Sequence, residues 1–204
     1  MKLTFNKNTM SAAIAPLMGS TVNKLDNPSI GGICFEAKDG ICTMTTYDLQ
    51  KGIKIIADVE IEEEGSCVIN AQRFASAVRA FSTDRITLTV GEDKQATLKS
   101  GRSRLQMNAM AGSSFPEIPP LTSKINFKIP QCVLKKLIGK VAYAMAINDH
   151  RNVLNGCYVE VHDGKLLTVS CDSFKLAKCL LNTSELENNN EDGSDLRFRF
   201  ILPV

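Results

Sequence analysis

The sequence predicts an α+β fold in which one unit, made of helices packed on antiparallel sheet, occurs twice. Three observations lead to this prediction. The chain matches itself without a gap when it is shifted by 124 residues, so that Gly32 aligns with Gly156. Some stretches have apolar residues three and four positions apart, which is typical of amphipathic helices. Asp-Gly pairs at 39–40 and 163–164 separate short extended segments, which is typical of β-hairpins.

The composition indicates a globular protein. Of the 204 residues, 44% are hydrophobic and 23% are charged, a balance unlike that of disordered or membrane proteins. The length allows two domains of ordinary size. The first residues show no apolar run behind a basic cluster, and no stretch is long enough to span a bilayer, so we expect a cytoplasmic protein.

The seven cysteines do not indicate a metal site. They form no Cys-x-x-Cys pair, and the chain has only two histidines, so we expect neither metal nor cofactor, and buried thiols in a reducing compartment. The net charge of +2 is too small to indicate nucleic-acid binding by itself. Such a role depends on where the charges lie.

The first copy of the repeat begins with a strand and a helix, which has Met10, Ile14 and Leu17 on one face. A hairpin follows, because Asp39 and Gly40 tolerate the positive φ of a two-residue turn. The further elements that we expect in this copy are hairpin strands 33–37 and 42–46, strands 52–59 and 66–70, a helix at 71–81, and strands 85–90, 96–100 and 103–109.

The second copy repeats this order from a helix at 131–145 through a hairpin with strands 157–161 and 166–170. Residues 200–203 correspond best to residues 67–70. Three prolines between 113 and 120 mark the boundary, so we expect domain 1 at 1–120 and domain 2 at 121–204. The second domain lacks a counterpart of the final helix and three strands. We therefore expect it to be incomplete at its C-terminus and the chain to be a truncated piece of a longer protein.

Catalysis is not indicated. His150 and His162 are isolated, and no Ser or Cys lies in a recognisable nucleophile motif. Asp48 and Asp172 occupy matching positions of the repeat and could form a carboxylate pair. Their place just after a strand favours hydrogen bonds to turn amides instead. We expect a protein that is not an enzyme.

Seven segments of the chain form a recognisable set: Thr46–Leu49, Gly65–Phe74, Lys99–Arg104, Phe115–Pro119, Leu134–Ile138, Leu154–Gly156 and Thr168–Leu176. Together they resemble the bacterial DNA polymerase III beta subunit, the sliding clamp. The resemblance covers nearly the whole chain and implies repeated DNA-clamp domains, of which a third is absent here. It also implies a homodimeric ring around duplex DNA that gives the replicative polymerase its processivity. A protein-interaction module of two repeats without a DNA role is the alternative.

Basic residues on two predicted helices are the first candidates for binding DNA. Lys136 and Lys140 lie four apart on the side opposite the apolar stripe, with Lys135 beside them, and Arg73 and Arg79 lie on the second helix. Ordinary solvated helix faces are the alternative. From the resemblance, two loop residues join this set, although both could be simple exposed residues. They are Lys24 and Asn148.

Two further sites follow from the resemblance. A hydrophobic pocket would bind short peptides of the polymerase, the clamp loader and repair proteins, and the usual motif Thr-Asp-Gly-His-Arg-Leu is Cys-Asp-Ser-Phe-Lys-Leu here. The dimer interface would use Arg102, Arg104 and Leu105, and an edge strand guarded by basic residues is the alternative. We expect the chain alone to be monomeric. The predicted pocket residues are Arg151, Leu154, Cys171, Ser173, Phe174, Lys175 and Leu176.

Overall fold

The computed structural model describes residues 1–22, 28–120, 127–162, 164–182, 187–188 and 197–203. The chain divides into two compact units, Met1–Pro120 and Leu121–Val204, which we describe separately as unit 1 and unit 2. Within the described ranges, no helix has the length and apolar character required to cross a membrane.

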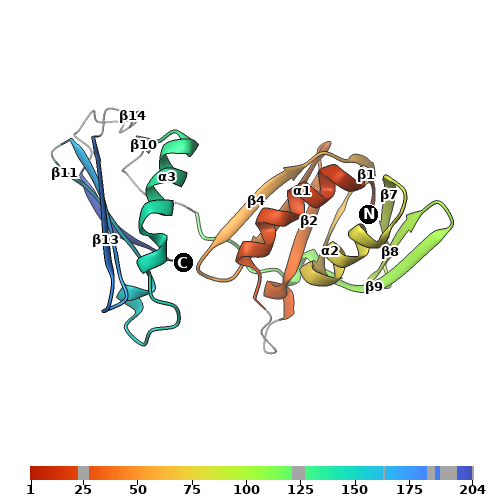
Figure 1. The fold of residues 1–204 in the computed structure, drawn as a ribbon. Coiled ribbons are helices and arrows are strands. Elements are labelled where there is room, and N and C mark those ends of the chain that lie inside the picture. Colours follow the sequence, from red (N-terminus) through yellow and green to blue (C-terminus); the bar gives the residue numbers. More distant parts are fainter. Residues whose placement is uncertain (23–27, 121–126, 163, 183–186, 189–196, 204) are drawn as a thin grey trace. The chain divides into compact units, whose positions relative to one another are not determined.

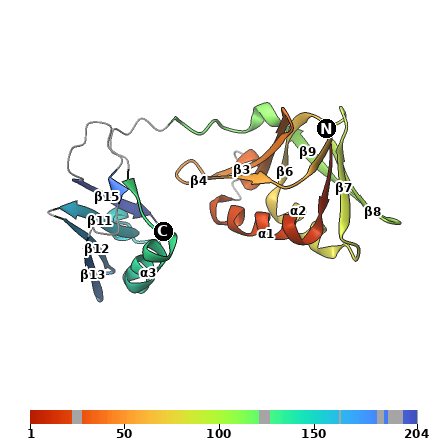
Figure 2. The same cartoon turned by 90° about the horizontal axis from the view of Figure 1, so that it is seen from above.

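Unit 1 is a nine-stranded antiparallel sheet with two helices, α1 (Lys7–Leu17) and α2 (Ala71–Ala80), side by side on one face (Figures 1 and 2). The strand order is β4-β3-β2-β6-β9-β8-β7-β1-β5. The strands are β1 (Lys2–Asn6), β2 (Gly32–Lys38), β3 (Ile41–Tyr47), β4 (Gly52–Ala57), β5 (Glu60–Glu63), β6 (Gly65–Asn70), β7 (Arg85–Val90), β8 (Gln95–Ser100) and β9 (Ser103–Ala111).

Asparagine caps begin both helices of unit 1. The Asn6 side chain accepts a hydrogen bond from the Asn8 amide at 2.8 Å, and the Asn70 side chain accepts one from the Arg73 amide at 3.0 Å. Each cap satisfies an amide that has no partner within the helix. At the centre of the core, the buried Phe74 ring of α2 lies 5.0 Å from the Phe35 ring, edge to face.

The predicted hairpin between β2 and β3 is confirmed. Asp39 has φ of 51° and Gly40 has φ of 75°, the left-handed pair that a tight two-residue turn requires. The predicted strand 52–59 was wrong in extent, because β4 ends at Ala57 and the chain turns into β5, which pairs with β1. The charged β5 has no apolar alternation, so the sequence pattern did not reveal it.

Unit 2 is a four-stranded antiparallel sheet in the order β13-β12-β11-β15, with the helix α3 on one face (Figure 1). The predicted helix 131–145 was too long, since α3 ends at Val141 and a 3-10 turn follows at Ala142–Ala144. The elements are β10 (Phe127–Lys128), α3 (Gln131–Val141), β11 (Gly156–His162), β12 (Lys165–Cys171), β13 (Leu176–Asn182), β14 (Glu187–Asn188) and β15 (Phe198–Pro203).

Strand registers in the two units repeat with the shift of 124 residues. Thr45 pairs with Lys54 in unit 1, and the matching residues Val169 and Lys178 pair in unit 2. Ile33 pairs with Ile69, and Cys157 pairs with Leu202, which agrees with the predicted correspondence of 67–70 with 200–203. The predicted α+β class with a repeated unit is therefore confirmed.

Gly32 and Gly156 occupy matching positions in the two units, and both are required for the same steric reason. A Cβ at Gly32 would lie 2.4 Å from the Val68 side chain of β6, and a Cβ at Gly156 would lie 2.6 Å from the Leu202 carbonyl of β15. Close approach of two strands therefore excludes a side chain at the start of β2 and of β11 alike.

Candidate nucleic-acid and docking surfaces

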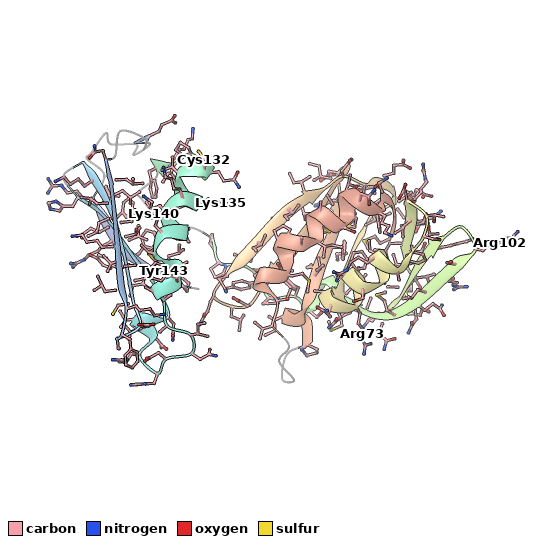
Figure 3. All side chains as sticks on the ribbon, in the orientation of Figure 1. Arg73, Arg102, Cys132, Lys135, Lys140 and Tyr143 are labelled. Carbon is pink, nitrogen blue, oxygen red and sulfur yellow. The ribbon has the colours of Figure 1, made fainter. Side chains whose placement is uncertain are left out.

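The three α-helices of the described residues contain no Asp or Glu, although the chain has 22 acidic residues. Each of the three carries at least one lysine or arginine. On α3 the exposed Lys135 lies on the side away from the sheet, and the exposed Lys140 lies nearer to it (Figure 3). The absence of carboxylates leaves the helix surfaces positive. The basic residues are Lys7 of α1, Arg73 and Arg79 of α2, and Lys135, Lys136 and Lys140 of α3.

The two arginines of α2 point to different neighbours. Arg79 donates from Nε to the Ala75 carbonyl at 3.1 Å and lines a small cavity beside Ser11 of α1. Arg73 lines a groove between α2 and β9. Of the other predicted DNA-binding residues, Asn148 lies in an exposed loop with φ of 58°, and Lys24 lies outside the described residues.

The groove between α2 and β9 has a volume of about 560 Å³. It lies beside an open strand edge: β9 pairs with β8 along Ser103–Asn108, but with β6 only at Ala109–Ala111. Leu105 and Met107 face the groove, whereas the exposed Arg104 stands opposite Lys99 in the register with β8. Arg102 lies at the hairpin tip (Figure 3). A strand added to this edge would meet an apolar groove and basic side chains.

Unit 2 brings Arg151 and Ser173 together through a network that includes Asp149. The Arg151 guanidinium donates two hydrogen bonds of 3.0 Å to the Asp149 carboxylate and one of 2.7 Å to the Ser173 hydroxyl. The Arg151 side chain, then its amide, hold the pKa of Asp149 well below its usual range. Asn155 closes the loop by exchanging hydrogen bonds with the Asp149 backbone. The loop therefore presents Arg151 in a fixed orientation.

The turn 172–175 is fastened by its first residue. The Asp172 carboxylate accepts from the amides of Lys175 at 2.6 Å and Phe174 at 2.9 Å, and these bonds lower its pKa. In unit 1, Asp48 accepts from the amides of Gln50 and Lys51 in the same way. The interpretation of both aspartates as turn-forming residues is thus confirmed.

Apolar side chains lie on this turn, directly before and after it, and in the loop that holds Arg151. Phe174 is 95% exposed and Leu176 is 66% exposed, whereas Leu154 and Cys171 are half-buried. The Cys171 Sγ accepts from the Ser173 amide at 3.3 Å. These side chains, with Arg151 and Lys175, are called the docking surface below. A contiguous patch of exposed large apolar groups is typical of a binding surface.

The sequence prediction missed two contributors to this surface. Asp149 orients Arg151, and the spacing Asp-x-Arg is the signal that could have revealed it. Tyr143 is 65% exposed, and its carbonyl accepts from the Lys175 ammonium at 3.3 Å. No sequence signal indicates the second contact, because it joins a helix end to a turn 32 residues later.

Two family models match the chain. The model for the N-terminal domain of the DNA polymerase III beta subunit matches residues 1–119, and the model for its central domain matches residues 128–195. Among curated proteins, the beta sliding clamp of Haemophilus influenzae is 27% identical over 195 residues, which are 93% of this chain and 52% of that protein. The beta sliding clamp of Escherichia coli is 27% identical over 180 residues, 88% of this chain and 49% of that protein.

Solved structures with the same fold include a sliding clamp of Bacillus subtilis, with a TM-score of 0.85 and 22% identity, covering 100% of this chain and 54% of that one. The DNA polymerase III beta subunit of Thermotoga maritima has a TM-score of 0.84 and 25% identity, covering 99% of this chain and 53% of that one. The chain thus spans about half the length of the curated relatives that it matches.

Proposed function

Because the chain belongs to the DNA polymerase III beta subunit family, we propose that it works as part of a sliding clamp. The clamp encircles duplex DNA and tethers the replicative polymerase, so that it acts by topology and contact and not by catalysis. The observation that carries the proposal is the absence of carboxylates from all three described α-helices, which bear six basic residues.

Positive helix surfaces suit a partner that must slide. Attraction between ammonium groups and phosphates is independent of base sequence, and loose contacts through water allow movement along the duplex. Lys135, Lys136 and Lys140 supply this attraction in unit 2, and Arg79 supplies it in unit 1. Arg73 lines the groove beside β9, so it can contact DNA and also a strand that binds in the groove. Lys24 and Asn148 remain candidate contacts.

Ring closure uses the open edge of β9. A strand from a third domain of a neighbouring subunit would pair with Ser103–Asn108, place apolar side chains in the groove against Leu105 and Met107, and place acids against Arg102 and Arg104. The homodimer is the product. Residues 1–204 taken alone are a monomer.

The docking surface binds short peptides of the polymerase, the clamp loader and repair proteins. Leu154 and Leu176 supply the apolar floor, and Phe174 adds an exposed ring. Arg151, Ser173 and Lys175 supply polar contacts, with Cys171 beside them. A protein-interaction module without DNA is the second candidate, and the exposure of Phe174 favours it.

Salt dependence of duplex binding tests the DNA role on the chain itself. Replacement of Lys135, Lys136 and Lys140 by alanine should reduce the slope of log K against log salt by roughly 2 to 3 units, because each phosphate contact contributes about 0.9. Fluorescence anisotropy of a labelled duplex measures the slope. The matched control replaces three exposed strand lysines, Lys54, Lys165 and Lys178. Equal losses in both triple variants would favour the interaction module.

Retention on DNA tests the topological part. The complete natural protein, once loaded, should remain on nicked circular DNA at moderate salt and dissociate when the circle is linearised. Equal loss from circular and linear DNA would exclude encirclement.

A further inference from the structure

In unit 1 a buried hydroxyl pair holds the end of the first helix. The Thr46 hydroxyl donates to the Leu17 carbonyl, the last residue of α1, at 3.1 Å and is 2.6 Å from the Ser20 hydroxyl. Thr46 and Ser20 are almost fully buried. Solvent and ligands therefore cannot reach this anchor.

The described part of unit 2 has no such hydroxyl pair at the matching positions. Ser170 replaces Thr46, and Ala144 replaces Ser20. Ser170 is 2% exposed, and its hydroxyl is the one buried side-chain polar atom that lacks a hydrogen-bond partner among the described residues. The turn Ala142–Ala144 packs on β12, and an unpartnered hydroxyl at this position weakens that packing.

In unit 2 an exposed, charged contact holds the turn Ala142–Ala144, instead of a buried hydroxyl pair. Lys175 donates from Nζ to the Tyr143 carbonyl at 3.3 Å and lies 3.1 Å from an Asp172 carboxylate oxygen. Carbonyls at a helix end carry partial negative charge that an ammonium stabilises. A bond from an ammonium to a carboxylate joins two ions and is stronger than its bond to a neutral carbonyl, so a second carboxylate beside Asp172 would compete for the N–H that Tyr143 accepts.

We propose that Lys175 is a ligand-responsive latch: an acidic group that docks on the turn 172–175 takes the ammonium from Tyr143 and releases the 3-10 turn Ala142–Ala144 that follows α3. The regulatory role rests on the proposed docking function, because the acid would come from a bound peptide. Docking would thereby loosen the end of the helix that bears Lys136 and Lys140. Unit 1 has no such response, since its anchor is buried.

Amide hydrogen exchange in the chain tests the latch without DNA or peptide, so its failure is separate from a failure of the proposed function. The reporters are the amides of Met145, which donates to Ala142, and Ala146, which donates to Leu154. Lys175→Met should speed their exchange about two- to five-fold, the usual size of a cation's effect at a helix end. The matched control is Lys178→Met, which removes an exposed lysine of β13 and should leave both amides unchanged.

Two further variants test the response to an acid and the lost anchor. Phe174→Glu tethers a carboxylate beside Lys175 and should speed exchange nearly as much as Lys175→Met, whereas Phe174→Gln should behave as wild type. Restoring the buried pair with Ala144→Ser and Ser170→Thr should return exchange in Lys175→Met toward the wild-type rate. Unchanged exchange in Lys175→Met would overturn the latch, and equal rates in the Glu and Gln variants would overturn its response to acid.

Discussion

Met10 of unit 1 and Leu134 of unit 2 occupy matching positions, yet 2% of Met10 is exposed and 39% of Leu134 is exposed. One turn later, Ile14 is buried and Ile138 is half-buried, whereas Leu17 and Val141 are both fully buried. The cause is α2, which packs beside α1 in unit 1, while the described part of unit 2 has one α-helix. The repeated apolar pattern thus decides which side of each helix packs on the sheet. The burial of the apolar residues at the margin of that side depends on a second helix.

The largest expected difference comes from truncating the two matched side chains. Met10→Ala should lower the free energy of unfolding of unit 1 by about 2–5 kcal/mol, because it opens a cavity in a closed core. Leu134→Ala should lower that of unit 2 by less than about 1 kcal/mol, since water already reaches the side chain. Urea titration followed by NMR signals of each unit measures both. Leu17→Ala and Val141→Ala, buried in both units, are the controls; equal losses for Met10 and Leu134 would break the comparison.

A smaller difference is expected for the matched hydroxyls. Thr46→Val should cost unit 1 about 1–3 kcal/mol, because the buried Ser20 hydroxyl loses its partner. Ser170→Ala should be neutral or stabilising in unit 2, because its hydroxyl has no bond to lose. The same urea titration reports both changes. A clear destabilisation by Ser170→Ala would show that the hydroxyl has a partner in solution.

The smallest effect concerns pH. The pKa values of Asp149 and Asp172 are lowered in the folded chain, so their ionised forms stabilise the loop and turn above the unfolded-state value of about 3.9. That stability is lost only as pH falls through the lower folded values. The NMR shift of the Lys175 amide should therefore stay constant from pH 7 to about 5. A midpoint above pH 4 would contradict this, and Asp172→Asn should remove the transition.

Sequence patterns predicted most of the fold because the deciding interactions were local. Asp39-Gly40 specifies its own turn, and the shift of 124 residues carried the strand register of unit 1 into unit 2. The strand β5 and the end of α3 were not predicted, since a charged edge strand and a helix end depend on tertiary partners. For the candidate site, the sequence placed Ser173, Phe174 and Lys175 on one turn because they are neighbours in the chain. The Lys175–Tyr143 contact and the open edge of β9 could not be predicted, since they depend on how distant segments fold together.

The helices without carboxylates separate charge within each unit. Acids gather elsewhere, and β5 alone carries three glutamates. The net charge of +2 therefore underestimates the attraction of the chain to a polyanion, because the local positive potential near the helices governs that attraction. Immobilised heparin should therefore retain the chain at low ionic strength, and each unit should bind it through its own helices and leave its strands free for a second partner.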